Sequence, residues 1–257
     1  MRNWVRNVLS PRVGERVSGT PTSASGASSF FLWWDLPYGE KLTEISVTLE
    51  VVLRPEVDRL VTFAFQSAFL KPGGGSCHLG LQHHPQFPQR GAVNWDGYSA
   101  KGESLDSDDP ALPSATGDLA TRDFAWQTGV PYRLTIERGD ELPDGRWAWV
   151  GSVSNLQSGE RVDIRKLITE SPHIRGPVMY IESYGPCDGP RVEARWSSAT
   201  AVSVDGGVRA VRSMRVDYQP HAAGGCTNTN SGVEGKHFVQ RAGQMRRTKA
   251  GSTIRLV

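Results

Sequence analysis

A strict alternation of apolar and polar residues is the feature that most narrows the fold of this chain. It is clearest between residues 45 and 54, where the apolar positions are Ile45, Val47, Leu49, Val51 and Leu53. Successive side chains of a β-strand point to opposite faces, so a period of two residues predicts a strand with one buried face. Residues 61–69 repeat the pattern.

Further alternating runs follow, separated by glycine and proline. We predict strands at 76–84, 91–98, 131–138, 146–154, 176–184, 191–197, 200–204 and 210–218. Pro143-Asp-Gly predicts a hairpin turn between two of them, because Gly145 accepts a positive φ. Residues 162–170 fit either a short helix or a strand.

About ten strands without alternating helices exclude a TIM barrel and a doubly wound α/β sheet. The fold class that remains is all-β, with two antiparallel sheets packed in a β-sandwich of the jelly-roll kind. We expect residues 1–29 to form a flexible arm, first basic and then rich in Ser and Gly. Residues 30–220 would form the sandwich, and residues 221–257 a Gly/Asn-rich loop with a basic tail.

Residues 101–121 interrupt the strand pattern with acidic residues and two prolines. A loop of this length is either functional or mobile. Its aspartates are hard oxygen ligands, but the spacing of an EF-hand, with its glycine and final glutamate, is absent. We therefore expect a solvated loop rather than a calcium site.

The charges nearly balance, with 29 Lys and Arg against 27 Asp and Glu, a formal net charge of +2. This balance gives no reason to expect nucleic acid as the main partner. No run approaches the ~18–20 apolar residues of a membrane span. After Glu234 the chain carries only basic charges, a pattern that fits a solvated tail or one that binds phosphate or anionic lipid.

The three cysteines form no metal-binding pair at short spacing. Cys187 and Cys226 both lie in Gly-rich loops, so a disulfide between them is possible. The alternative is that all three cysteines are reduced thiols. The basic N-terminus lacks the apolar core of a signal peptide. The sequence leaves the cellular compartment undecided. Either the protein remains inside the cell, or its leader was removed.

The segment from residue 77 to residue 98 has the most unusual polar pattern. On the first predicted strand, His78, Gln82 and His84 share a face, and on the second strand Asn94 and Asp96 do so. If the two strands pair, these five side chains converge on one polar sheet face. A site on a rigid sheet is the simplest functional interpretation. The alternative is a tight connection with exposed histidines.

Such a face suits sugars, because Asn, Asp and Gln hydrogen-bond hydroxyl groups while Trp95 or Tyr98 covers a pyranose ring. Glu182 is a further candidate, since its strand alternates it with tyrosines. His78, His84 and Asp96 are also compatible with a divalent metal. We predict ligand contacts from His78, Gln82, His84, Asn94, Trp95, Asp96, Tyr98 and Glu182, with neither a metal nor a cofactor.

The same strings carry a resemblance. Gly80-Leu-Gln followed by Val93-Asn-Trp-Asp resembles a pattern in uncharacterised bacterial proteins with lectin-like, concanavalin-type jelly-roll domains. The likeness continues at Tyr132-Arg-Leu-Thr-Ile-Glu and Trp147-Ala-Trp-Val-Gly, and it covers residues 30–218. The resemblance implies a β-sandwich and a carbohydrate ligand, and it supplies no catalytic residue.

Three functions follow from these observations. The first is a binding module that holds a saccharide or a similar polar ligand on a sheet face. The second is a glycan-active hydrolase or lyase on the same scaffold, although neither a Gly-x-Ser-x-Gly nor a phosphate-binding loop is present. The third is an assembly protein, a homo-oligomer joined through its arm and its tail.

Overall fold

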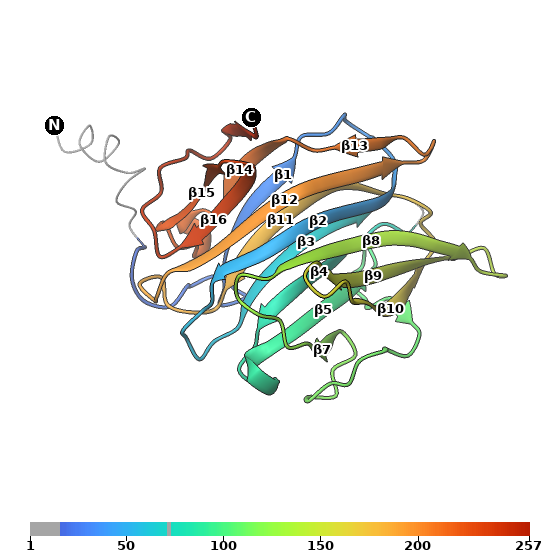
Figure 1. Ribbon diagram of the computed structural model, residues 1–257, viewed down its shortest axis with the longest axis horizontal. Coiled ribbons are helices and arrows are strands. Elements are labelled where there is room, and N and C mark those ends of the chain that lie inside the picture. The colour runs from blue at the N-terminus through green and yellow to red at the C-terminus, as the bar shows by residue number, and fades with distance from the viewer. Residues whose placement is uncertain (1–15, 71–72) are drawn as a thin grey trace.

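The computed structural model describes residues 16–70 and 73–257, and it confirms the all-β class (Figure 1). Within these residues the only helical elements are two 3-10 turns, η1 (Pro88–Arg90) and η2 (His221–Ala223). All strand pairings are antiparallel and form two sheets that curl over one another. No helix in the described part of the chain is long and apolar enough to cross a membrane.

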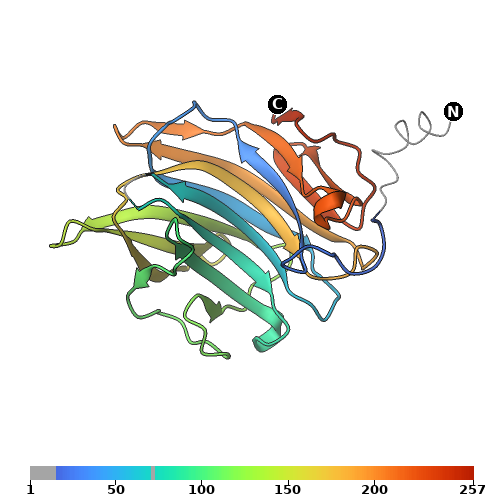
Figure 2. The same ribbon diagram turned by 180° about the vertical axis from the view of Figure 1, so that it is seen from behind.

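The first sheet carries the polar segment singled out in the sequence. From edge to edge its strands are β17 (Thr253–Arg255), β14 (Ser213–Tyr218), β1 (Ser28–Trp34), β11 (Ile174–Ser183), β3 (Val61–Phe69), β4 (Ser76–His83), β5 (Gly91–Tyr98) and β7 (Thr121–Asp123). Figure 2 shows this sheet from its outer side.

The second sheet packs against the inner side of the first. Its strands are β15 (Thr229–Glu234), β16 (His237–Ala242), β12 (Val192–Ser203), β2 (Leu42–Leu53), β8 (Pro131–Glu141), β9 (Trp147–Asn155), β10 (Arg161–Thr169) and β6 (Asp106–Ser107). β13 (Val208–Ala210) pairs with the far half of β12. A single pair, Ile174 with Leu42, links the two sheets at one end.

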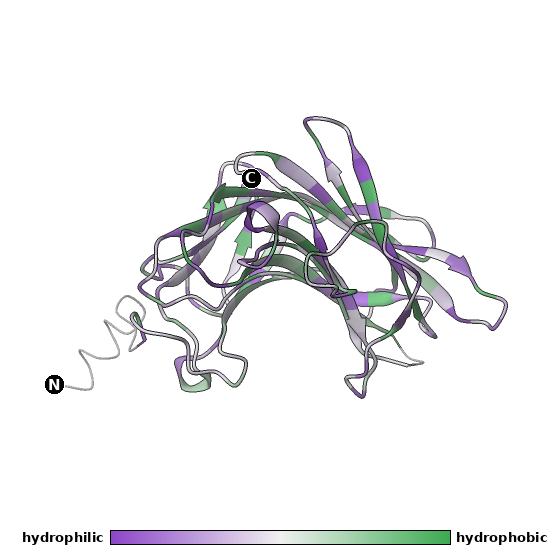
Figure 3. Cartoon of the chain, turned by 90° about the horizontal axis from the view of Figure 1, so that it is seen from below, coloured by the Kyte–Doolittle hydropathy of each residue, from purple (hydrophilic) through white to green (hydrophobic). Residues whose placement is uncertain are grey.

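Figure 3 shows that the two layers form an arch. The outer side of the first sheet is the concave face of this arch, and the outer side of the second sheet is its convex face. We use these two names below. The concave face is where a sheet can surround a ligand with side chains from several strands.

The core lies between the sheets and follows the alternation of the sequence. Its largest fully buried side chains include Trp95, Trp149 and Trp196. Gly151 has a direct reason to be glycine, because a Cβ there would lie 2.5 Å from Cδ2 of Trp95. The tryptophan and the glycine therefore fit together across the two layers.

The structure corrects the predicted ends of the domain. Residues 221–257 are not only loop and tail, because β15, β16 and β17 add strands to both sheets. Some of the basic side chains of this segment form ion pairs, since Arg241 pairs with Glu193 and Glu234. Residues 1–15 of the expected arm lie outside the described residues, and the amide of Cys187 donates to the carbonyl of Gly19 at 2.8 Å. The ambiguous segment at 162–170 lies largely in strand β10.

Residues 101–121 close one open side of the sandwich. The amide of Ala111 donates to the carbonyl of Ile164 on β10, and the amide of Trp95 on β5 donates to the carbonyl of Ala120. The carboxylate of Asp108 accepts a hydrogen bond from the amide of Lys166 at 2.6 Å. The acidic segment thus connects the edge of one sheet with the edge of the other.

The cysteine question has a definite answer in the structure. Cys187 and Cys226 form a disulfide with a Cα–Cα distance of 5.5 Å, and Cys77 is a buried free thiol. The bridge joins the β11–β12 connection to the segment before β15. It therefore fastens the two sheets together near the N-terminal residues of the described chain.

Candidate functional site

The pairing of β3, β4 and β5 brings the predicted polar residues together on the concave face. The register places Gln66 beside His78, and His78 beside Asp96. One row along, Ala64 lies beside Gly80, and Gly80 beside Asn94. The next row places Thr62 beside Gln82. The strands therefore align three rows of side chains, and we call this group the polar site.

The centre of the polar site consists of the two smallest residues, Ala64 and Gly80. A Cβ on Gly80 would lie 2.4 Å from the Cβ of Ala64, so only glycine fits there. Ala64 is nevertheless completely buried, because longer neighbouring side chains cover it.

Three polar atoms of the site are buried without a hydrogen-bond partner among the described residues. They are Oε1 of Gln82, Oδ1 of Asn94 and Nδ1 of His78. Gln82 and Asn94 are only 7% and 8% exposed. Each unsatisfied buried group costs roughly 1–3 kcal/mol, so such groups are rare in folded proteins unless they have a further role.

The amide of Asn94 is held in place, because its Nδ2 donates to Oγ1 of Thr121 on β7 at 3.0 Å. Burial lowers the pKa of His78, and the charge of Asp96 and the nearby side chain of Asn94 oppose this shift. The depressed pKa favours a neutral imidazole, which has one nitrogen that accepts a hydrogen bond.

Asp96 is held in place by Arg165, a residue of the second sheet that sequence reasoning missed. Arg165 on β10 has a side chain only 4% exposed, and its Nη2 lies 3.2 Å from Oδ1 of Asp96. The same guanidinium donates to the carbonyl of Trp95 at 3.0 and 3.3 Å and to Oγ of Ser107 at 2.8 Å. The second sheet thus holds a carboxylate of the first.

Aromatic side chains line the other half of the concave face, on β1 and β11. Phe31 lies 6.5 Å from Trp33 and 6.1 Å from Tyr180, measured between ring centroids. The guanidinium of Arg215 lies 5.7 Å from the ring centroid of Trp33, and the indole nitrogen of Trp33 is buried without a partner among the described residues. These rings form an apolar platform beside the polar site.

Glu182 lies at the border between the platform and the polar site. Its Oε1 accepts a hydrogen bond from Oγ of Ser29 at 3.0 Å. Burial raises the pKa of Tyr184, and the charge of Glu182 together with a hydrogen bond to it raises the pKa further. In the register Glu182 pairs with Thr62, which pairs with Gln82, so a carboxylate and a carboxamide share one row.

Two of the predicted contacts need correction. Trp95 cannot cover a ligand on this face, because its side chain points into the core, is fully buried and donates its indole N–H to the carbonyl of Arg165. His84 follows the last residue of β4 and packs on Phe87 with a centroid distance of 4.7 Å, and its Nδ1 accepts from the amide of Gln86. His84 is therefore part of the turn at the sheet end.

The other predicted residues share the concave face. Tyr98 lies near His78, with ring centroids 6.2 Å apart. Among the described residues, no group of three or more His, Cys, Asp or Glu side chains has the arrangement of a metal site. Sequence reasoning missed Gln66, Thr62 and the platform, because only the order of strands in the sheet places β3 and β1 beside this segment.

Comparison with known proteins yields no sequence match. No family model matches the chain, and no curated protein does. Among solved structures, Scytalido-glutamic peptidase with a peptide-based transition state analogue superposes with a TM-score of 0.44 at 10% identity, covering 87% of this chain and 98% of that chain.

Two further solved structures superpose with lower TM-scores. SCP-B, a member of the eqolisin family of peptidases in complex with a tripeptide, has a TM-score of 0.42 at 11% identity, over 87% of this chain and 98% of that one. A prokaryotic β-1,3-1,4-glucanase from a mouse hindgut metagenome has a TM-score of 0.25 at 9% identity, over 64% and 87%. We transfer no residue role from these superpositions.

Proposed function

We propose that this protein is a binding module whose concave face holds a saccharide or a ligand with the same hydroxyl-rich chemistry. The observation that carries the proposal is the set of buried, unpartnered atoms on Gln82, Asn94 and His78. Two of them are amide oxygens, which only accept hydrogen bonds, and the neutral imidazole also accepts. The ligand must therefore bring donors, and sugar hydroxyl groups supply them.

The aromatic platform supports the same ligand class. Phe31, Trp33 and Tyr180 offer ring faces and edges beside the polar site, and a pyranose combines an apolar face with polar edges. Four strand spacings separate β1 from β5, about 19 Å along the sheet. A chain of several sugar units fits this width better than a single sugar.

Binding to a glycan array and calorimetry with the best glycan test the proposal. We expect Asn94→Ala and Gln82→Ala to weaken binding at least tenfold, since about 1.4 kcal/mol is a tenfold change and each substitution removes a buried acceptor. Gln127→Ala, at an exposed residue outside the face, is the control and should bind like the wild type. Unchanged binding in both site variants, with an intact fold, refutes the proposal.

Asp96→Ala is a poor probe of binding. It removes the carboxylate that faces the buried guanidinium of Arg165. The loss would combine a fold defect with a binding defect, because an uncompensated buried charge is costly. Asn94 and Gln82 avoid this problem.

A second candidate, a hydrolase, rests on the row shared by Glu182 and Gln82. A carboxylate can activate a water molecule, and an amide N–H can stabilise a developing oxyanion. Asp96 is a weak partner for Glu182 in glycoside hydrolysis. Their backbones are separated by three strand spacings across the sheet, about 14 Å, and by a further four residues along the strand, whereas carboxyl pairs in glycosidases lie about 5–9.5 Å apart.

Turnover on a panel of glucans, other glycans and unfolded proteins tests the hydrolase. The expected result is activity that falls at least 100-fold in Glu182→Gln and that is retained in Glu160→Gln, a control at an exposed position. Glycan binding without turnover on any substrate contradicts the hydrolase and leaves the binding module.

A further inference from the structure

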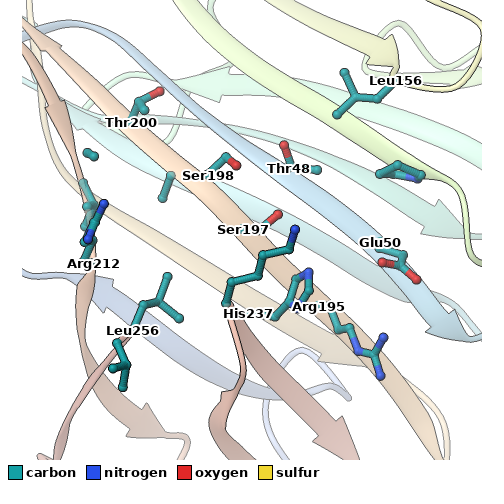
Figure 4. Close-up of a pocket in the computed structure, with 16 residues that line it drawn as sticks. Thr48, Glu50, Leu156, Arg195, Ser197, Ser198, Thr200, Arg212, His237 and Leu256 are labelled. Carbon is teal, nitrogen blue, oxygen red and sulfur yellow. The ribbon is translucent and has the colours of Figure 1, made fainter.

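A cavity lies on the convex face, on the opposite side of the sandwich from the polar site. It has a volume of about 660 Å³ and is walled by β2, β12, the residues that follow β13, the start of β16 and the last residues of the chain (Figure 4). We call it the convex pocket. Pockets for small molecules usually measure about 300–1,000 Å³, so its size suits an organic ligand rather than a bare ion.

The walls of the convex pocket carry more positive than negative charge. Arg195, Arg212 and Lys236 line it, and Glu50 is the only carboxylate side chain among the described lining residues. Within the described chain, neither Arg212 nor Lys236 has an ion-pair partner. Figure 4 shows Arg195 beside Ser197 and His237, with Arg212 across the pocket.

The guanidinium of Arg195 is only weakly paired. Its Nε is buried and has no hydrogen-bond partner among the described residues. The carboxylate closest to it, Glu193, lies 3.8 Å away. That carboxylate already accepts hydrogen bonds from Arg241 at 2.8 and 3.0 Å and from Arg191 at 2.6 Å. One carboxylate therefore faces three arginines, and of these Arg195 lies farthest from it.

A further arginine, Arg133, lies behind the pocket wall. Nη2 of Arg133 donates to Oγ of Ser46 and to Oγ1 of Thr200, at 2.5 and 2.6 Å, and Nη1 donates to the carbonyl of Ser198. These hydrogen-bond partners are neutral, and the carboxylate that acts on Arg133 is Glu44, which does not line the pocket. β12 is irregular between Ser197 and Thr200, with a φ of 50° at Ser198, and both serines line the pocket.

Much of the remaining wall is apolar, beside the hydroxyl groups of Thr48 and Thr200. Pro131, Leu156, Val211 and Leu256 contribute the apolar part, and Val257 is fully exposed. A ligand that fits both parts must carry an oxyanion for the cations and a carbon skeleton for the apolar walls. We propose that the convex pocket binds a small organic anion, a phosphate, sulfate or carboxylate on an apolar body, with its head group on Arg195 and Lys236.

Calorimetry with 2-naphthalenesulfonate, its uncharged analogue 2-naphthalenemethanol and inorganic sulfate tests this proposal. We expect the sulfonate to bind at least tenfold more tightly than either of the other two, and more weakly as salt rises. Equal binding of the uncharged analogue overturns the role of the cations. Equal binding of inorganic sulfate overturns the role of the apolar walls, and no binding of the sulfonate overturns both.

Variants then locate the site. Lys236→Gln and Arg195→Gln should each weaken sulfonate binding at least fivefold. Lys236 has no side-chain partner among the described residues, so its variant is expected to fold normally. Lys249→Gln, at an exposed lysine outside the pocket, is the matched control. Equal losses in the control, or a loss in Asn94→Ala on the concave face, overturn the assignment to the convex pocket.

Discussion

Replacing Arg165 by methionine tests whether a buried guanidinium joins the two sheets beneath the polar site. The substitution keeps most of the side-chain length and removes the hydrogen bonds to the Trp95 carbonyl, to Ser107 and to Asp96. At about 1.5 kcal/mol for each of the three acceptors, these bonds from a charged group amount to about 4.5 kcal/mol. Part of this returns, because the charge no longer needs to be desolvated. We expect a net loss of about 2–3 kcal/mol.

Chemical denaturation followed by tryptophan fluorescence measures this loss as a lower midpoint with an unchanged slope. Because Arg165 is buried, the loss should be nearly the same at low and at high salt. Arg161→Gln is the control on the same strand, since its partners Glu137 and Asp163 are solvent-accessible, and it should cost less than about 1 kcal/mol. A cost for Arg165→Met as small as that of the control would refute the reasoning.

Two further predictions concern pH and redox state. Burial lowers the pKa of His78 below its ordinary 6.5, so the unfolded chain binds more protons and stability should fall as pH decreases below about 6.5. Thermal melts from pH 8 to pH 5 should show a smaller decrease in His78→Gln, and equal decreases would contradict the assignment. The Cys187–Cys226 bridge spans a separation of 39 residues, so its reduction should cost about 4 kcal/mol. Denaturation with and without reductant measures the cost, and Cys77→Ser is the control for the free thiol.

The strands could be predicted from the sequence because their alternation is a local property. The expected pairing of 76–84 with 91–98 occurs as β4 and β5, and it places His78 beside Asp96. The same alternation placed Trp95 opposite Asn94, and the error was to assign both to one ligand surface. A strict use of the two-residue period would have assigned Trp95 to the core.

The strand order could not be predicted, because it depends on contacts between distant parts of the chain. Ser29 and Glu182 are 153 positions apart and yet form a hydrogen bond. Arg165 contacts Asp96 of the polar site from the other sheet, and no local sequence pattern indicates this contact. β15 was missed because Asn, Ser and Gly dilute its apolar positions to Val233, and β16 was missed because its large apolar residues, Phe238 and Val239, are adjacent rather than alternating.

The edges of the two sheets have a consequence for the behaviour of the protein at high concentration. An exposed edge strand is a template on which a second chain can add a strand, and natural proteins often limit this risk with very short edge strands. The first sheet ends in β17 and β7, each three residues long, and the second sheet ends on one side in β6, with two residues. These short strands cover the longer strands β14, β5 and β10, so edge-to-edge aggregation is discouraged by the topology itself.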